Sequence, residues 1–467
     1  MGSQAMGFYR VFFAVGLWWV LRDVSMADWP APGETQPQNA WLADWEWVRS
    51  IANRPDLVRQ LETVVLGALV LFAVGLWTRG SYLFVVVGLT LWTLIRLQHT
   101  GTHPWAVLLV TLWCLVTVRW GDGFSLDRVV MRLRGRSSLA DSAGRDYGFA
   151  VWMPGFVLGT AMIGAAYAKL SESGLEWIIG GAVKYHFVTD AQNAPVDWGL
   201  WIASHHWAAV TFSALGVGTE AALIIAPFLR PGWCRSLLGI AGFGLLLGFY
   251  LFQNEIWWAW WMLWACFFIP WSLAWKRVAD GFRMWKSESS QPETTASFGT
   301  TRGVMNIQLF TVVLVFSLQV IASVFRVEEQ PILSNYPMYS STYPSTDAFD
   351  ASSPIQSPMR FVSLTTDGEQ DVTAVLERTD LDGPLRDYLV ALADGAPLTA
   401  ERSERLRWVA DQFYDRSGQH LGVVTFMREN RAFDWTAGEV RSAGMAAIIT
   451  FDTEDMRVVG ADDRTSR

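Results

Sequence analysis

Long blocks of apolar residues alternate with short polar segments over the first two thirds of the chain. The blocks have about 18 residues or more, the length that an α-helix needs to cross the hydrocarbon core of a bilayer. The first block lacks the small-residue cleavage pattern of a signal peptide and is interpreted as a span. The pattern predicts nine membrane-spanning helices, at residues 8–24, 61–77, 81–97, 104–119, 148–168, 207–229, 236–252, 255–275 and 304–325.

The pattern changes after Phe325, where apolar runs become short and are separated by Asp, Glu and turn pairs such as Asp367-Gly368. The predicted elements are hairpin strands at 359–365 and 372–376, a helical segment at 385–414, and strands at 421–427 and 445–451. The sequence therefore predicts an all-α polytopic membrane domain at 1–325 and a small α+β domain at 326–467.

Composition and charge exclude several classes of protein. Apolar residues make up 51% of the chain and charged residues only 17%, which is typical of a protein whose main partner is the lipid bilayer. With 36 basic and 44 acidic residues, the net charge of −8 leaves no basic excess for binding nucleic acid. The three cysteines form neither a disulfide framework nor a Cys-x-x-Cys motif.

Basic residues gather in two loops, at 120–147 and after Trp275. Positively charged loops remain in the cytoplasm, and these two loops fall on the same side of a nine-span chain. The N-terminus is therefore predicted to lie inside, and residues 326–467 outside.

Ionisable residues within apolar spans are rare, because each costs about 2.5 to 3.5 kcal/mol at the centre of a membrane helix. Lys169 lies at the outer end of the fifth predicted span, where it serves as a base in a dry pocket or extends to the interface. Glu220 lies in the sixth span among small residues and requires a partner or a proton. Arg10, in the first span, is the candidate partner.

Further candidates lie at the predicted outer ends of the spans. His103 opens the fourth span, and His205 and His206 precede the sixth. Histidines there can orient a substrate, relay protons or bind metal, but the adjacent pair is poorly spaced for one ion, and no metal is predicted. Trp257 and Trp258 begin a tryptophan-dense stretch that either lines a cavity for a planar ligand or forms an interfacial belt.

Three stretches together resemble the vitamin K-dependent gamma-carboxylase and its bacterial HTTM-domain relatives. They are Phe8-Tyr-Arg-Val-Phe-Phe-Ala-Val-Gly-Leu, Ala165-Ala-Tyr-Ala-Lys-Leu and Glu176-Trp-Ile-Ile-Gly-Gly, with His103 opening a span between the first two. The resemblance covers residues 8 to about 275. The sequence departs from the family at Tyr250, where many relatives carry histidine.

The resemblance implies a bacterial cytoplasmic-membrane enzyme that couples epoxidation of a reduced quinone, of the vitamin K or menaquinone type, to carboxylation of a protein glutamate. O2 and CO2 are then co-substrates, and a secreted or membrane protein supplies the glutamate. Lys169 matches the family's base and His103 the histidine that assists carboxylation. Trp177, Trp257, Trp258 and Tyr250 are the predicted quinone-binding residues.

Two other interpretations remain open. In one, the protein keeps the quinol and Lys169 but acts as an oxidoreductase or monooxygenase without a glutamyl substrate. In the other, it is a non-enzymatic membrane scaffold or immunity-type protein, and the C-terminal domain binds a partner.

Overall fold

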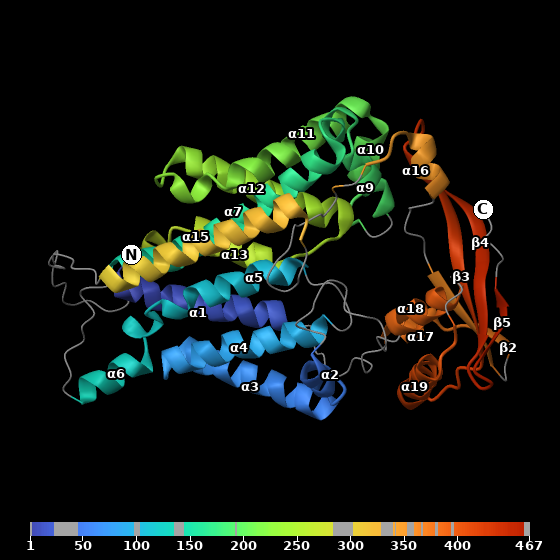
Figure 1. The fold of residues 1–467 in the computed structure, drawn as a ribbon, viewed down its shortest axis with the longest axis horizontal. Helices are drawn as coiled ribbons and strands as arrows, with labels where there is room; N and C mark the ends of the chain where they lie inside the picture. The colour runs from blue at the N-terminus through green and yellow to red at the C-terminus, as the bar shows by residue number, and fades with distance from the viewer. Residues whose placement is uncertain are drawn as a thin grey trace.

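The computed structural model describes residues 2–22, 45–97, 103–134, 144–191, 194–283, 302–327, 340, 342–352, 359–365, 368–378, 382–393 and 397–461. A bundle of long helices occupies the N-terminal two thirds, and a sheet with its own helices lies at one end of the bundle (Figure 1).

Six of the described helices are long and apolar enough to cross a membrane. They are α1 (Ser3–Leu21), α3 (Pro55–Val74), α4 (Thr78–Arg96), α7 (Gly144–Ser173), α12 (Trp233–Gln253) and α15 (Arg302–Phe325). These helices fit a multi-pass membrane protein. The other predicted spans contain α5 (His103–Cys114), α11 (His206–Leu223) and α13 (Trp258–Phe268), so the number nine stays a prediction.

Shorter helices connect the long ones. They are α2 (Glu46–Ala52), α6 (Leu126–Leu133), α8 (Glu176–Ile179), α9 (Val183–Thr189), α10 (Trp198–Ser204) and α14 (Trp271–Arg283), with 3-10 turns at Leu115–Thr117, Trp120–Asp122 and Ala226–Phe228. The predicted span at 255–275 is in fact two helices, α13 and α14. Pro270 lies between them, and because proline lacks the N–H that a continuing helix would need, the first helix ends there.

Helix α1 supplies much of the core of the bundle. Its Met6, Tyr9, Phe13 and Leu17 are completely buried, at the three- and four-residue spacing of one helix face. Tyr9 stacks on Trp120 at a centroid distance of 5.8 Å, and its hydroxyl donates to the carbonyl of Ala150. The first span is therefore a central helix of the bundle.

The C-terminal part is an α+β fold built on one antiparallel five-stranded sheet of order β2-β1-β3-β4-β5. The strands are β1 (Met359–Thr365), β2 (Gly368–Asp371), β3 (Val423–Asp434), β4 (Glu439–Asp452) and β5 (Arg457–Ala461), and the helices are α16 (Thr346–Ser352), α17 (Thr373–Arg378), α18 (Asp382–Ala393) and α19 (Ala400–Ser417). Apolar residues of α17, α18 and α19 form one core with inward residues of the sheet.

Two sequence predictions for this part are wrong. The second hairpin strand is β2, and residues 373–376 of the predicted strand belong to α17, so that Val372 and Leu376 reach the same core at helical spacing. The helical segment 385–414 is two helices, the second of which begins where the hydroxyl of Thr399 accepts a hydrogen bond from the N–H of Arg402. The prediction of strand β1 is confirmed at both ends.

An aromatic cluster joins this domain to the bundle. Tyr185 of α9 stacks on Phe349 of α16 at 5.2 Å and meets the edge of Trp435, beside the end of β3, at 5.8 Å. Val188 of α9 and Phe433 of β3 complete the buried part of the cluster with Ala203 of α10. Figure 1 shows α9, α10 and α16 meeting beside the upper end of the sheet. One face of α9 is thereby covered by the C-terminal domain.

Candidate functional site

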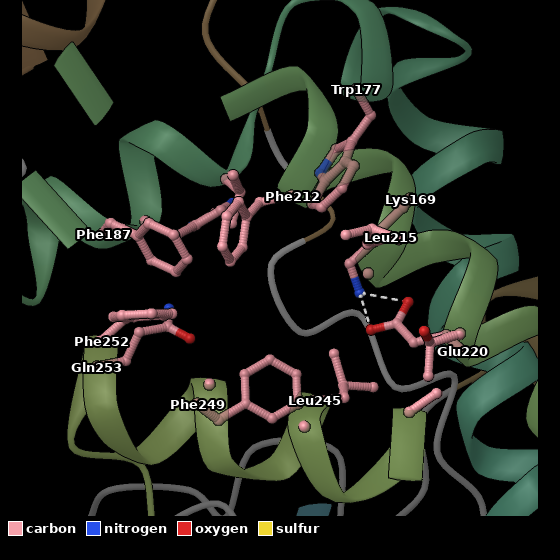
Figure 2. Close-up of a pocket in the computed structure, with 17 residues that line it drawn as sticks. Lys169, Trp177, Phe187, Phe212, Leu215, Glu220, Leu245, Phe249, Phe252 and Gln253 are labelled. Atoms are coloured by element: carbon pink, nitrogen blue, oxygen red, sulfur yellow. Dashed lines mark hydrogen bonds and ion pairs between the residues drawn. The ribbon is translucent and has the colours of Figure 1, made fainter. Parts of the chain in front are cut away.

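A pocket of about 300 Å³ lies between α11 and α12, and α8 and α9 contribute to its wall. Aromatic rings occupy two sides of it in Figure 2, with Trp177 and Phe212 facing Phe249. The described residues that line it are Lys169, Trp177, Val183, His186, Phe187, Phe212, Leu215, Gly216, Thr219, Glu220, Ala241, Gly244, Leu245, Gly248, Phe249, Phe252 and Gln253. The wall is thus apolar over most of its extent, with polar groups at its ends.

A buried ion pair forms one end of the pocket (Figure 2). The Lys169 Nζ atom lies 2.9 Å from Oε1 and 3.0 Å from Oε2 of Glu220. Lys169 is 3% exposed and Glu220 2%. Of the two alternatives predicted for Glu220, a partner or a proton, the structure shows a partner, but the predicted partner is wrong, because Lys169 rather than Arg10 pairs with it.

Small residues allow the helices that carry this pair to approach each other. Ala166 of α7 and Ala182, just before α9, are buried in one cluster with Trp177 and with Val217 of α11. Small side chains let helix backbones come close, so the Glu220 carboxylate on α11 reaches the Lys169 amine on α7. The ring of Trp177 lies 5.5 Å from the Lys169 Nζ atom and adds a cation–π contact.

The opposite end of the pocket is polar but carries no ion pair. The Gln253 side chain lines it and donates through Nε2 to Oδ2 of Asp190 at 3.1 Å. Asp190 follows α9 and is 8% exposed. Burial raises the pKa of Asp190, the hydrogen bond from Gln253 lowers it, and the nearby Glu255 raises it, so that the pKa lies at about 6.

The raised pKa of Asp190 gives a pH dependence of stability whose sign is fixed. The folded protein binds the proton more tightly than the unfolded chain does, so this group's contribution to stability is lost as pH rises from about 4 to about 6. Asp190→Asn removes this loss and is expected to raise the free energy of unfolding at pH 7 by roughly 2 to 3 kcal/mol relative to wild type. Urea unfolding in detergent at several pH values measures this difference.

Asp197→Asn is the matched control, because Asp197 is exposed on the same segment. Its free energy of unfolding is expected to stay within about 0.5 kcal/mol of the wild-type value from pH 4 to pH 7. A difference between wild type and Asp190→Asn that does not change between pH 4 and pH 7 would contradict the assignment.

Arg10 serves a different purpose from the one predicted. Its guanidinium donates to the carbonyls of Trp120 at 2.8 Å, Gly123 at 3.1 Å and Phe124 at 2.7 Å, with a longer contact to that of Ala73 at 3.4 Å. The side chain is completely buried. Arg10 therefore holds the turn after the 3-10 helix at Trp120–Asp122 against α1 and the end of α3, away from the pocket.

The three histidines predicted as candidates are not among the described residues that line the pocket. His103 begins α5, which supplies none of the described lining residues, and its side chain lies outside the described residues. The role in carboxylation that the resemblance implies for His103 stays a prediction. His205 stacks on Trp201 at 4.6 Å with Nδ1 2.8 Å from that residue's carbonyl oxygen, and the next residue, His206, is exposed. Neither lines the pocket.

Of the four aromatic residues predicted to bind a quinone, Trp177 lines the pocket. Trp257 packs against Phe249 at 4.7 Å, outside the described lining, and Trp258 is exposed beside Trp19. Tyr250 follows Phe249 on α12, and the turn of about 100° per residue directs it to another face. Trp257 thus supports the wall of the pocket without forming it.

Sequence reasoning missed the residues of α12 and α9 that form the pocket. A signal for α12 is present: Ala241, Gly244 and Gly248 recur at the spacing of one helix face, which leaves space beside the helix. The three residues of α9, among them His186, carry no comparable signal, because α9 has only seven residues.

The arrangement can bind a largely apolar, flat ligand and exchange a proton with it. Aromatic walls bind a flat ring, and the ammonium and carboxylate at one end can donate or accept a proton in a site that contains little water. Among the described residues, no three His, Cys, Asp or Glu side chains group as metal ligands would. A scan against protein-family models, a search of curated proteins and a search of solved structures found no match.

Proposed function

We propose that the protein is a quinol-dependent membrane enzyme in which Lys169 and Glu220 together take up a proton from a reduced quinone. The observation that carries the proposal is the buried Lys169–Glu220 pair at the end of an aromatic-walled pocket. Its net reaction is proposed to be gamma-carboxylase-like, with O2 and CO2 as co-substrates and a protein glutamate as acceptor, as the sequence resemblance implies.

The lining residues fit a quinone head group of the vitamin K or menaquinone type. Trp177, Phe212 and Phe249 would stack on its ring, and the volume is at the lower end of the range for small-molecule sites. Lys169 would face one ring oxygen, and Gln253, at the other end, would serve a second polar group. When bound, the reduced quinone supplies electrons and an acidic hydroxyl.

Lys169 and Glu220 are suited to move the hydroxyl proton without leaving a net charge unbalanced. As an ammonium and a carboxylate, the pair is neutral overall and can accept one proton. When Nζ gives its proton to the Glu220 carboxylate and takes one from the ligand, the pair ends as an ammonium beside a carboxylic acid. The ammonium then compensates the negative charge left on the ligand, and that compensation is strong in a site of low dielectric constant.

The proposed setting is the cytoplasmic membrane of a bacterium, with the N-terminus inside and the C-terminal domain outside. This orientation rests on the basic loops, and it places the end of the bundle that carries Lys169 on the outer side. A secreted or membrane-bound glutamyl substrate would be accessible there. The second candidate function, quinol oxidation without carboxylation, is favoured by the fact that it needs only a group that takes up a proton, which the Lys169–Glu220 pair in the described lining can supply.

Quinol oxidation by the purified, full-length protein tests the proposal. The double variant Lys169→Met with Glu220→Gln removes both charges and leaves no buried ion unpaired. It is expected to lower the rate of quinol oxidation to that of the uncatalysed reaction while binding of the oxidised quinone persists. Incorporation of labelled CO2 into a glutamyl peptide, measured on wild type with a menaquinol, separates the carboxylase from the oxidoreductase.

Lys184→Met provides the matched control. Lys184 neighbours the pocket on α9, but it lies over the rings of Tyr185 and Trp435 rather than in the pocket. This variant is expected to keep the wild-type rate. If the double variant also keeps it, Lys169 and Glu220 take no part in the reaction and the proposal fails. If wild type binds no quinone at all, the scaffold interpretation replaces it.

A further inference from the structure

A second cavity lies at the other end of the bundle, as a groove of about 730 Å³ between α7, α12, α13 and α14. Its walls are mostly apolar, with Trp152, Ile240, Trp264, Phe268 and Leu273 among the lining residues. Ile240 is largely exposed, so the groove opens on the side of the bundle. It is separate from the pocket beside Lys169, and no described residue lines both.

The groove contains one charged side chain, Arg235, and no Asp or Glu among the described residues that line it. One guanidinium nitrogen, Nη2, donates to the carbonyl of Phe267 at 2.8 Å, and the guanidinium carbon lies 4.0 Å from the centre of that ring. Among the described residues no carboxylate pairs with it. A guanidinium has five N–H donors, so most of its donor capacity remains for a ligand.

The depth of the groove in the membrane follows from helix geometry. Val151 lines the groove and Lys169 lines the pocket, both on α7, and 18 residues separate them. At the rise of an α-helix this corresponds to about 27 Å, close to the thickness of the hydrocarbon core. The groove therefore lies at the opposite membrane interface, and α14, which lines it with Leu273, continues into the basic residues Lys276 and Arg277.

An arginine partly surrounded by apolar walls at this depth has a strong preference for an anion. A cation without a partner is costly near the hydrocarbon, and a phosphate both neutralises it and accepts its hydrogen bonds in a bidentate geometry. The apolar walls beside Arg235 suit the hydrocarbon chain attached to such a phosphate, whereas a free phosphate would leave them without a partner. In a zwitterionic lipid the phosphate is already neutralised by the cation of its own head group, so its attraction to Arg235 is weaker.

We propose that this groove binds an anionic phospholipid of the cytoplasmic leaflet, with the phosphate on Arg235 and an acyl chain against Ile240, Trp264 and Phe268. The site is independent of the proposed quinol reaction. A lipid bound there would hold the start of α12 at that leaflet. Further along, the same helix forms one wall of the Lys169 pocket.

Thermal unfolding of the full-length protein in a nonionic detergent tests this proposal. Phosphatidylglycerol is expected to raise the midpoint in a saturable manner, and phosphatidylcholine to have little effect. Arg235→Gln is expected to raise the concentration of phosphatidylglycerol needed for half of the effect by about tenfold, since a hydrogen-bonded charge is lost. Arg235→Lys retains the charge and is expected to keep the preference for phosphatidylglycerol.

Ser236→Trp fills the groove without changing its charge and is expected to weaken the lipid effect as Arg235→Gln does, because Ser236 is exposed in the groove wall. Arg230→Gln is the control, since Arg230 is exposed nearby but does not line the groove. The proposal is overturned if phosphatidylcholine or inorganic phosphate raises the thermal midpoint as much as phosphatidylglycerol does. It is also overturned if Arg230→Gln weakens the phosphatidylglycerol effect as much as Arg235→Gln does. An Arg235→Lys variant that responds equally to phosphatidylglycerol and phosphatidylcholine would also overturn it.

Discussion

Lys169→Met is expected to lower the free energy of unfolding by about 3 to 5 kcal/mol, because it leaves the Glu220 carboxylate buried without its cation. Both groups are almost inaccessible to solvent, and the carboxylate receives two hydrogen bonds from the amine. Glu220→Gln strands the Lys169 ammonium in the same way and is expected to cost a similar amount. Denaturant titration in detergent micelles measures both.

The double variant distinguishes a coupled pair from two separate effects. Lys169→Met with Glu220→Gln removes both charges, so its cost is expected to be well below the sum of the two single costs. Arg457→Met is a useful reference, because Arg457 forms an exposed ion pair with Asp455 and its loss is expected to cost less than about 1 kcal/mol. Costs of Lys169→Met and Glu220→Gln that simply add in the double variant would show that the two side chains do not interact.

Arg10→Met is expected to destabilise the protein by about 4 kcal/mol, through a different physical cause. The variant leaves several buried carbonyl groups of the turn at Trp120–Phe124 without a donor, and each unsatisfied group carries a desolvation cost of about 1 to 3 kcal/mol. Arg10→Lys is expected to fall between Arg10→Met and wild type, because an ammonium cannot reach carbonyls in several directions as a guanidinium does.

Arg79→Met controls for the loss of a positive charge, since Arg79 is exposed on α4 and forms no hydrogen bond with described residues. Its cost is expected to stay within about 0.5 kcal/mol. Thermal and chemical unfolding in the same detergent compare the three variants. An Arg10→Met protein as stable as Arg79→Met would mean that the hydrogen bonds of Arg10 do not contribute to the fold.

Hydrophobic patterning was sufficient to locate the long helices of the bundle, since each predicted span overlaps a helix, but it missed the short helices between them, such as α8 and α9. It could not predict which helices are neighbours. Glu220 requires a partner by energetics alone, but whether that partner is Arg10 or Lys169 depends on the packing of α7 against α11. Arg10 illustrates the same limit, because its acceptors are backbone carbonyls, which every residue offers and no side-chain pattern marks.

The pocket was predictable in part. Lys169 and Glu220 were singled out because ionisable residues in apolar spans are costly, Trp177 came from the resemblance to a family, and all three line it. Gln253 and Asp190 were not foreseen, because their hydrogen bond joins the end of one helix to the residue after another, 63 positions apart. In the C-terminal domain the Asp-Gly pair predicted a turn after β1, and β1 does pair with the strand that follows, whereas β5 is a short edge strand without a clear alternation of apolar residues.

Helix α9 links two parts of the molecule thermodynamically. It has only seven residues, with His186 and Phe187 in the wall of the pocket and Tyr185 and Val188 in the aromatic cluster with the C-terminal domain. A rotation of that domain against the bundle must either carry the pocket wall with it or separate Tyr185 from Phe349. A ligand that favours one position of α9 therefore favours one orientation of the domain, and by reciprocity anything that holds the domain alters the affinity of the pocket by the same factor.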